Sequence, residues 1–233
     1  MNVPSTFSER LDAIQSRIHA ACARAGRTSD DITLVAVSKT KPVEMLQEAF
    51  EAGVRHFGEN RVQEAATKIP HLPKAGLTWH LIGHLQSNKA KSAVELFDVI
   101  HSVDSIALAT RLNRLAGEHN KQVPIFLQVH LGDEESKAGV DPADLPALFQ
   151  ASYQLPHLNI TGLMAIPPYF PDPEQVRPSF VTLRQLRDQL AVQFPDQPPL
   201  PFLSMGMSHD FEVAIEEGAT HVRVGTALFG GRF

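Results

Sequence analysis

Short apolar runs and amphipathic segments alternate along nearly the whole chain. The run at residues 32–38, ITLVAVS, is too continuous for a strand with one wet face and is typical of a strand covered on both faces of a parallel sheet. The segment that follows it, PVEMLQEAFEAG at 42–53, has apolar residues at helical spacing. About eight such units follow one another, which predicts a (β/α)8 TIM-type barrel of the α/β class.

The same pattern gives the expected position of each element. Strands are predicted at residues 32–38, 54–58, 77–83, 97–102, 123–130, 158–165, 201–205 and 220–225. The helices that follow them are predicted at 42–53, 59–69, 87–96, 105–120, 141–153, 173–194, 208–218 and 226–230, with starts marked by Pro42, by Asp104 or Ser105, by Asp141 and by Ser208.

One further helix is predicted before the barrel begins. Residues 5–25 carry apolar side chains at helical spacing, and Gly26 ends the segment. We therefore expect one domain over residues 1–233, in which the segment 1–26 packs on the barrel as an extra N-terminal helix. A doubly wound open sheet is the alternative, but a chain without a Gly-rich dinucleotide fingerprint favours a closed barrel.

Composition excludes several classes of partner. The formal net charge is -5 and the pI about 6.1, so neither nucleic acid nor an anionic membrane is an expected partner. No basic segment with a following apolar run opens the chain, and no apolar stretch approaches the ~20 residues of a membrane span. The single cysteine, Cys22, can build neither a disulfide framework nor a cysteine metal cluster. These features favour a cytoplasmic protein.

Polar groups follow the predicted strands at the end where barrels of this class bind their ligands. Lys39 comes directly after the first strand, and Asn60 follows the second. A lysine at this position is either a solvated surface group or one that is partly desolvated. In the second case its pKa falls and it can form a Schiff base with a carbonyl compound.

Two glycine-containing segments near the end of the chain resemble anion sites. LSMGMSHD at 203–210 and THVRVGTALFGG at 220–231 each place Gly with Ser or Thr between a strand and a helix, where free backbone N–H groups attract anions. The loops after strands seven and eight commonly bind phosphate in these barrels. A phosphate site and a Schiff-base lysine suit a ligand with both a phosphate and an aldehyde, such as pyridoxal 5'-phosphate (PLP).

Several motifs together resemble the pyridoxal phosphate homeostasis protein family, whose fold is similar to the N-terminal barrel of alanine racemase. The motifs are VAVSKTKP, HFGENRVQE, WHLIGHLQSNK, HSVDS, GLMAIPP, LSMGMSHDFEVAIEEG and VRVGTALFG, in this order along the chain. The resemblance implies that Lys39 carries PLP as an internal aldimine and that Arg223 faces the pyridine nitrogen. It also implies that Ser204 or Ser208, with Gly225 and Thr226, holds the phosphate, and that Asn60, His80, Ser87 and Met164 line the pocket. His130 is a departure, because we expect Asn at that position in the family.

Arg223 bears on whether the protein is an enzyme. A guanidinium favours a neutral pyridine ring, which weakens carbanion chemistry without preventing the covalent link to lysine. We therefore expect a protein that binds PLP, buffers it and delivers it, with apo PLP-dependent enzymes as possible partners and no clear turnover. The expected state is a monomer, because the second domain that pairs alanine racemase subunits is missing.

Two alternatives stay open from the sequence. A PLP-dependent amino-acid racemase or lyase would need a second base, for which Tyr169 is a candidate, or an arginine for the substrate carboxylate near Arg177. A cofactor-free barrel enzyme would use Lys39 as an aldolase-type amine. Metal binding is not expected, since the spacing of His80 and His84 aligns two ligands only on a helix and WHLIGH is predicted as a strand.

Overall fold

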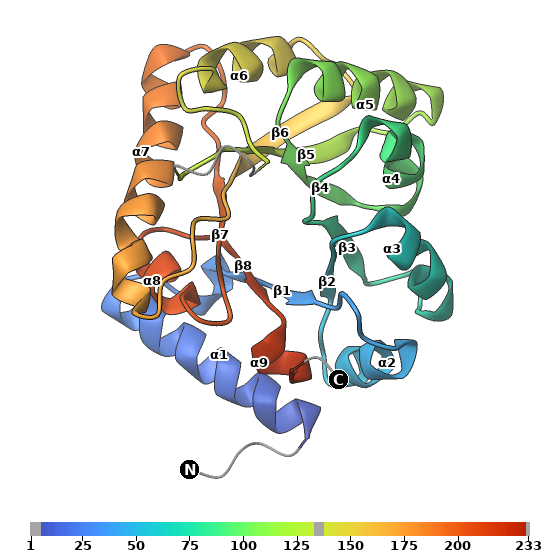
Figure 1. Ribbon diagram of the computed structural model, residues 1–233, viewed down its shortest axis with the longest axis vertical. Helices are drawn as coiled ribbons and strands as arrows, with labels where there is room; N and C mark the ends of the chain where they lie inside the picture. The colour runs from blue at the N-terminus through green and yellow to red at the C-terminus, as the bar shows by residue number, and fades with distance from the viewer. Residues whose placement is uncertain (1–5, 133–137, 232–233) are drawn as a thin grey trace.

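The computed structural model describes residues 6–132 and 138–231. Within these residues, parallel strands close into a barrel in the order β1 to β8, with β8 paired to β1 (Figure 1). The predicted closed (β/α)8 fold is confirmed. The strands are β1 (Thr33–Val37), β2 (His56–Glu59), β3 (Thr78–Leu81), β4 (Val99–Val103), β5 (Val123–Gln128), β6 (Leu158–Met164), β7 (Phe202–Met207) and β8 (His221–Val224).

Helices form the outer layer around the strands (Figure 1). They are α1 (Phe7–Arg24), α2 (Val43–Glu51), α3 (Val62–Lys68), α4 (Ala90–Leu96), α5 (Ile106–Glu118), α6 (Leu145–Tyr153), α7 (Arg177–Gln193), α8 (Phe211–Glu216) and α9 (Thr226–Phe229). Each of α2 to α9 follows the strand of the preceding number, as a series of β–α units requires.

Five helices, α3, α4, α6, α7 and α8, begin three or four residues later than the sequence predicts. Helix α6 begins at Leu145 after a turn, and α7 begins at Arg177 after the short 3-10 helix Pro173–Val176. Helix α8 begins at Phe211 with Asp210 as its N-cap residue, although Ser208 was predicted to mark that start. The carboxylate of Asp210 accepts the backbone N–H of Met207 at 2.6 Å, which turns the chain before the helix. Ser208 is therefore left to contact the neighbouring strand end.

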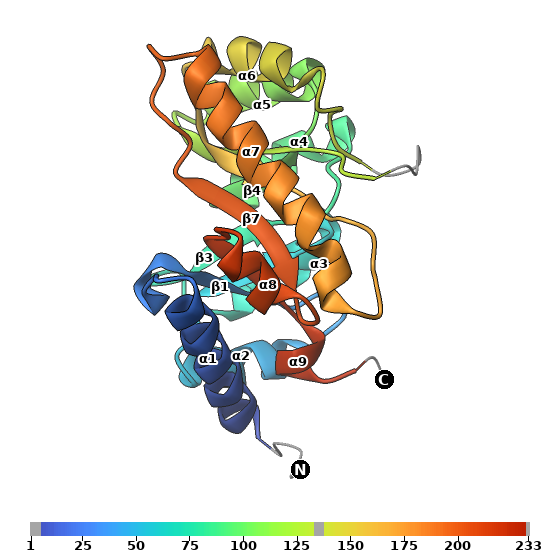
Figure 2. The ribbon, with the colours of Figure 1, turned by 90° about the vertical axis from the view of Figure 1, so that its left-hand side faces the viewer.

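Helix α1 lies beside α8 and α9, at the point where the barrel closes (Figures 1 and 2). Its first residue, Phe7, is fully buried and its ring contacts that of Phe229 at a centroid distance of 5.2 Å. Along the same helix, Arg17 makes two hydrogen bonds of 2.7 Å to the carboxylate of Glu212. The N-terminal helix thus packs on the last two helices of the barrel.

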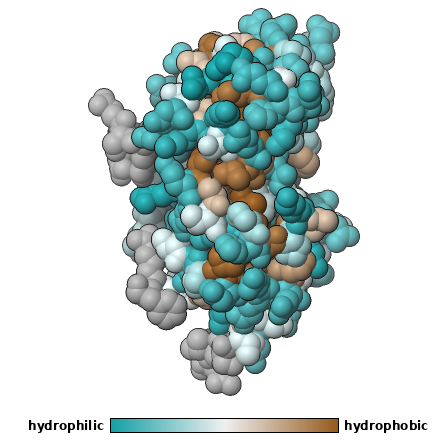
Figure 3. Space-filling view, turned by 90° about the vertical axis from the view of Figure 1, so that its right-hand side faces the viewer, coloured by the Kyte–Doolittle hydropathy of each residue, from teal (hydrophilic) through white to brown (hydrophobic). Residues whose placement is uncertain are grey.

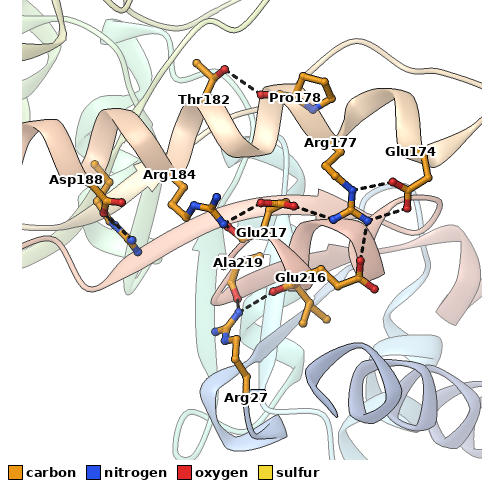
Figure 4. Close-up of polar contacts among 12 residues, drawn as sticks. Arg27, Glu174, Arg177, Pro178, Thr182, Arg184, Asp188, Glu216, Glu217 and Ala219 are labelled. Atoms are coloured by element: carbon orange, nitrogen blue, oxygen red, sulfur yellow. Dashed lines mark hydrogen bonds and ion pairs between the residues drawn. The ribbon is translucent and has the colours of Figure 1, made fainter. Parts of the chain in front are cut away.

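Arg177 is held by a cluster of carboxylates between α7 and α8. Its guanidinium donates to Glu174, Glu216 and Glu217 at 2.7–2.8 Å, and Arg184 also pairs with Glu217 (Figure 4). Such partners keep the guanidinium charged and raise the pKa of Arg177 above its ordinary value. This arginine is engaged in joining two helices.

The helices turn polar faces outward. The side of the molecule shown in Figure 3 is mostly hydrophilic, and its hydrophobic residues gather in a band down the middle. Helix α5 is an example, with Leu108, Leu112 and Leu115 buried and Arg111 exposed. In the described part of the chain, no helix has both the length and the apolar character needed to cross a membrane.

The packing of α1 leads to a stability prediction. Phe7→Ala removes a fully buried ring from the contact with α9, and the free energy of unfolding should fall by about 3–5 kcal/mol. Val192→Ala, at a side chain that is 82% exposed on α7, should change it by less than about 0.5 kcal/mol. Urea unfolding of the three proteins measures both effects. Equal effects of the two substitutions would contradict the packing of α1.

Candidate functional site

A cavity of about 300 Å³ opens at the carboxyl ends of the barrel strands. Its walls come from the loops after β1, β2, β3, β6, β7 and β8, as the barrel fold predicts for a functional site. The residues that line it are Val37, Lys39, Thr40, Lys41, Asn60, Ile82, Ile166, Tyr169, Met207, Ser208, His209, Arg223, Gly225, Thr226 and Gly230. Six of the ten sequence-predicted site residues are among them: Lys39, Asn60, Ser208, Arg223, Gly225 and Thr226.

Lys39 is half-buried and stands two residues beyond the end of β1. It lies in a turn that is closed by a hydrogen bond of 3.1 Å from the N–H of Lys41 to the carbonyl of Ser38. Thr40, the next residue, has a φ of 64°, a left-handed conformation that a β-branched side chain rarely adopts. The lysine therefore stands on a strained turn at the mouth of the barrel.

Backbone amides just after β8 lie near this turn, because β8 pairs with β1. The hydroxyl of Ser208 accepts hydrogen bonds from the N–H groups of Gly225 and Ala227, at 3.2 and 3.4 Å. Gly225 itself runs close to β1, since a Cβ atom there would meet the Val37 side chain and carbonyl at 3.2 Å. These two amides can donate to one oxygen atom, and here that atom is the Ser208 hydroxyl oxygen.

Arg223 forms part of the cavity floor and is almost fully buried. Its guanidinium donates to the hydroxyl of Ser204 at 2.6 Å and to the carbonyl of Ala165 at 2.9 Å. Burial lowers the pKa of Arg223 to about 10, against the attraction of Asp210, so the group stays charged at neutral pH. It offers further N–H donors and no acceptor to whatever occupies the cavity.

Asn60 is positioned by the loop after β3. A Cβ atom at Gly83 would lie 2.3 Å from the carbonyl oxygen of Asn60, so only glycine lets the two loops approach this closely. The glycine of the GHLQSN motif therefore places the loop that carries Asn60 against the cavity.

Four predicted site residues do not line the cavity. Met164 and Ser204 are fully buried at neighbouring positions of β6 and β7. Ser87 is exposed in the short 3-10 helix Ser87–Lys89. His80 lies inside the barrel on β3. His130, the departure noted in the sequence, lines a separate cleft with Asp141 and Pro178.

A chain of hydrogen bonds runs through the barrel interior behind Arg223. Nδ1 of His101 lies 2.9 Å from the Ser204 hydroxyl, Nδ1 of His80 lies 2.9 Å from Nε2 of His101, and Nδ1 of His56 lies 3.0 Å from Nε2 of His80. All contacts are satisfied when each neutral ring accepts at Nδ1 and donates from Nε2, with Ser204 donating to His101. The Ser204 oxygen accepts from Arg223, because a guanidinium only donates hydrogen bonds.

The sequence contains a signal for buried histidines in the barrel interior. His80, His101 and His221 each lie inside a predicted strand with an apolar residue on at least one side. In a barrel, such inward positions meet in layers at the axis. Here the rings of His80, His101 and His221 lie within 5.1–6.1 Å of one another, with Phe126 stacked on His101 at 4.2 Å.

The family model of the alanine racemase N-terminal domain matches residues 10–233 of this chain. The pyridoxal phosphate homeostasis protein of Aquifex aeolicus (strain VF5) is 47% identical over 224 residues, which cover 96% of this chain and 97% of that protein. The protein of the same name from Escherichia coli (strain K12) is 44% identical over 229 residues, 97% of each chain. The chain belongs to the pyridoxal phosphate homeostasis protein family.

Among solved structures, PipY of Synechococcus elongatus PCC7942 with PLP bound is 46% identical to this family member. The two superpose with a TM-score of 0.85 over 97% of this chain and 100% of PipY. The resemblance found in the sequence motifs is thereby confirmed, together with the barrel fold that it implied.

Residues that were not predicted to hold PLP also shape the cavity of this family member. Tyr169 and His209 face each other at the rim, with ring centroids 5.2 Å apart, and Tyr169 is 71% exposed. Ile82 and Ile166 add apolar surface. In the described ranges 6–132 and 138–231, no group of three or more His, Cys, Asp or Glu residues is placed to hold a metal ion.

The buried histidines predict how stability depends on pH. Burial lowers the pKa of His80 and of His101 well below the usual value, so these rings stay neutral in the folded protein while they protonate near pH 6.5 in the unfolded chain. The unfolded state then binds more protons below pH 6.5, and stability falls as pH decreases. Each ring contributes about 1.4 kcal/mol per pH unit over that range.

Urea unfolding at pH 7 and pH 5 measures this loss. His101→Gln keeps hydrogen-bonding groups but removes one titrating ring, so its stability should fall less steeply than that of the wild type. Burial raises the pKa of Glu59 and of Asp210, which works in the opposite direction in both proteins and cancels in the comparison. Equal slopes in the two proteins would show that His101 titrates normally in the folded state.

Proposed function

We propose that this protein binds pyridoxal 5'-phosphate reversibly through Nζ of Lys39 and holds it for delivery to enzymes that require it, with no turnover of its own. The proposed setting is the cytoplasm and the proposed state is a monomer. The observation that carries the proposal is one cavity that is lined by Lys39, by Gly225 and Thr226 after β8, and by the buried guanidinium of Arg223.

The residues of the cavity fit the chemical groups of PLP. The amine of Lys39 can add to the aldehyde carbon with loss of water, which needs no co-reactant. The amides that donate to the Ser208 hydroxyl would donate to phosphate oxygens if that hydroxyl turned away, with the hydroxyls of Ser208 and Thr226 as further donors. A volume of about 300 Å³ is at the small end of typical ligand sites and suits a single small cofactor.

Arg223 supports binding rather than turnover. A guanidinium only donates hydrogen bonds, so it pairs best with a pyridine nitrogen that carries no proton. Bound PLP supplies an electron sink for carbanion chemistry, and an unprotonated ring is a weak one. Ser204 and Ala165 hold the guanidinium in place at 2.6 and 2.9 Å.

Arg177 and Tyr169, the candidates for catalytic groups of a racemase or lyase, are poorly placed for those roles. Arg177 donates to three glutamates between α7 and α8, so it is engaged away from the cavity. Tyr169 does line the cavity, but its side chain is largely exposed to water at the rim. PipY contains PLP in its solved structure, and the named relatives are homeostasis proteins, which also supports the carrier function.

The covalent role of Lys39 is tested by visible absorption spectroscopy. Wild type mixed with PLP and desalted should keep an absorption band of bound PLP. Lys39→Ala should lose it, because the amine of Lys41, which also lines the cavity, already donates to the backbone carbonyls of residues 229–231. Lys91→Ala, at an exposed position of α4, serves as the control and should keep the band. Racemisation of alanine measured on the same samples should stay at background. A retained band in Lys39→Ala, or turnover by wild type, would contradict the proposal.

The phosphate role of the β8 end is tested by comparing PLP with pyridoxal, which lacks the phosphate. Thr226→Val removes a hydroxyl donor, so the Kd for PLP should rise about tenfold or more, as for a lost hydrogen bond to a charged group, while the Kd for pyridoxal stays unchanged. Thr182→Val, on α7, is the matched control. A parallel loss for both ligands would place the effect of Thr226 elsewhere than at the phosphate.

A further inference from the structure

A buried cluster of charged residues lies directly behind the turn that carries Lys39. Lys68, the last residue of α3, donates from Nζ to Oε1 of Glu59 at 2.8 Å and to Oε1 of Glu64 at 2.6 Å. Its third contact is the backbone carbonyl of Ser38, at 2.8 Å. An ammonium group has three N–H donors, and these contacts use all three.

The three contacts of Lys68 surround Lys39 along the chain. The Ser38 carbonyl lies before Lys39, and Glu64 accepts the backbone N–H of Thr40 directly after it. Glu59 accepts the Ser38 hydroxyl at 2.7 Å. Helix α3 and the end of β2 therefore fix both peptide groups that flank Lys39.

The turn needs such support because its backbone is strained. Thr40 has a φ of 64°, and a β-branched residue in this region is disfavoured unless its surroundings hold it there. The bonds at the Thr40 N–H and the Ser38 carbonyl are the contacts that resist relaxation of the turn. Strain of this kind is typical of functional sites.

Burial argues that the cluster does not serve stability alone. The Lys68 side chain is 7% exposed and that of Glu59 is fully buried. Buried ion pairs lose much of their attraction to desolvation, and apolar residues of similar volume usually stabilise a fold as well or better. Burial also raises the pKa of Glu59, and its second oxygen, Oε2, has no hydrogen-bond partner among the described residues. Because this buried ion pair is costly to desolvate and lies beside Lys39, we look for its role in the placement of Lys39.

We propose that Lys68 is a positioning residue for Lys39, holding the strained Ser38–Thr40 turn so that the Lys39 amine is aimed into the cavity. Lys68 does not line the cavity, so it acts through the turn and not on the ligand. Glu64 links Lys68 to the turn, because its Oε1 accepts hydrogen bonds from both Lys68 and the Thr40 N–H. This inference rests on the proposed binding of PLP at Lys39, but the state of the turn can be measured without it.

The first experiment uses Lys68→Met, which keeps the length of the side chain and removes its charge. In protein without PLP, hydrogen exchange followed by mass spectrometry should show the Thr40 amide exchanging on the order of tenfold faster than in wild type. If the competent turn is then populated in about a tenth of molecules, the Kd for PLP rises about tenfold. Lys121→Met is the control. Lys121 donates to backbone carbonyls of α4 and does not line the cavity, so its loss should change neither quantity.

A second variant covers the case in which Lys68→Met does not fold. The Glu64 side chain is 23% exposed, and Glu64→Ala removes only the partner of the Thr40 N–H and one contact of Lys68. It should also speed exchange at Thr40 and weaken PLP binding. Glu64→Gln, which keeps an oxygen for the Thr40 N–H, should recover part of the affinity.

The outcomes separate this inference from the proposed function. Wild type that binds no PLP would remove the proposed function, and exchange at Thr40 would still decide whether Lys68 holds the turn. Folded Lys68→Met or Glu64→Ala with wild-type exchange at Thr40 and wild-type Kd would overturn the positioning role. A loss of thermal stability with no change in either quantity would overturn it too, because that result indicates a purely structural ion cluster.

Discussion

The hydrogen-bonded pairing of β1 with β8 closes the barrel, and the arrangement of the cavity depends on it. Val35 lies opposite Arg223 and Ala36 opposite Val224 in this pair. The residues just beyond the two strands, Lys39 and Gly225, therefore emerge at the same edge although they are far apart in sequence. In an open sheet of the same order, β1 and β8 would be opposite edge strands, and the amine and the backbone amides would not share a site.

Closure also creates an interior that must be filled, and this barrel fills part of it with polar side chains. Ser204, His101, His80 and His56 make a continuous chain of hydrogen bonds that begins at Arg223. A buried guanidinium without partners would be very costly, and a half-satisfied network would be worse than an apolar core. The chain satisfies the groups behind the cavity and leaves further donors of Arg223 for its contents.

The residues of the cavity suit the binding of a cofactor better than catalysis with it. Lys39, the amides near Gly225 and the hydroxyl of Thr226 suit an aldehyde and a phosphate, the two ends of one ligand. The floor offers a cation where a strong electron sink would require a carboxylate. Arg177 and Lys68, which each contact three other residues, join elements of the fold and do not line the cavity. This choice of residues supports the proposed role of the site in holding a cofactor.

The sequence alone determined the order of strands and helices, the closed barrel and the position of Lys39 at a strand end, because hydrophobic periodicity and turn residues are local properties. It also determined the family, through motifs that are contiguous. Only the tertiary structure decided which residues line the cavity. Ser204 and His80 lie inside predicted strands, and the side to which a strand residue points depends on barrel closure and on register shifts such as the one between Ser204 and Met207. The Lys68 cluster could not be predicted for the same reason. The histidines inside the strands indicated inward positions but not which rings would meet, since their hydrogen bonds join residues of different strands.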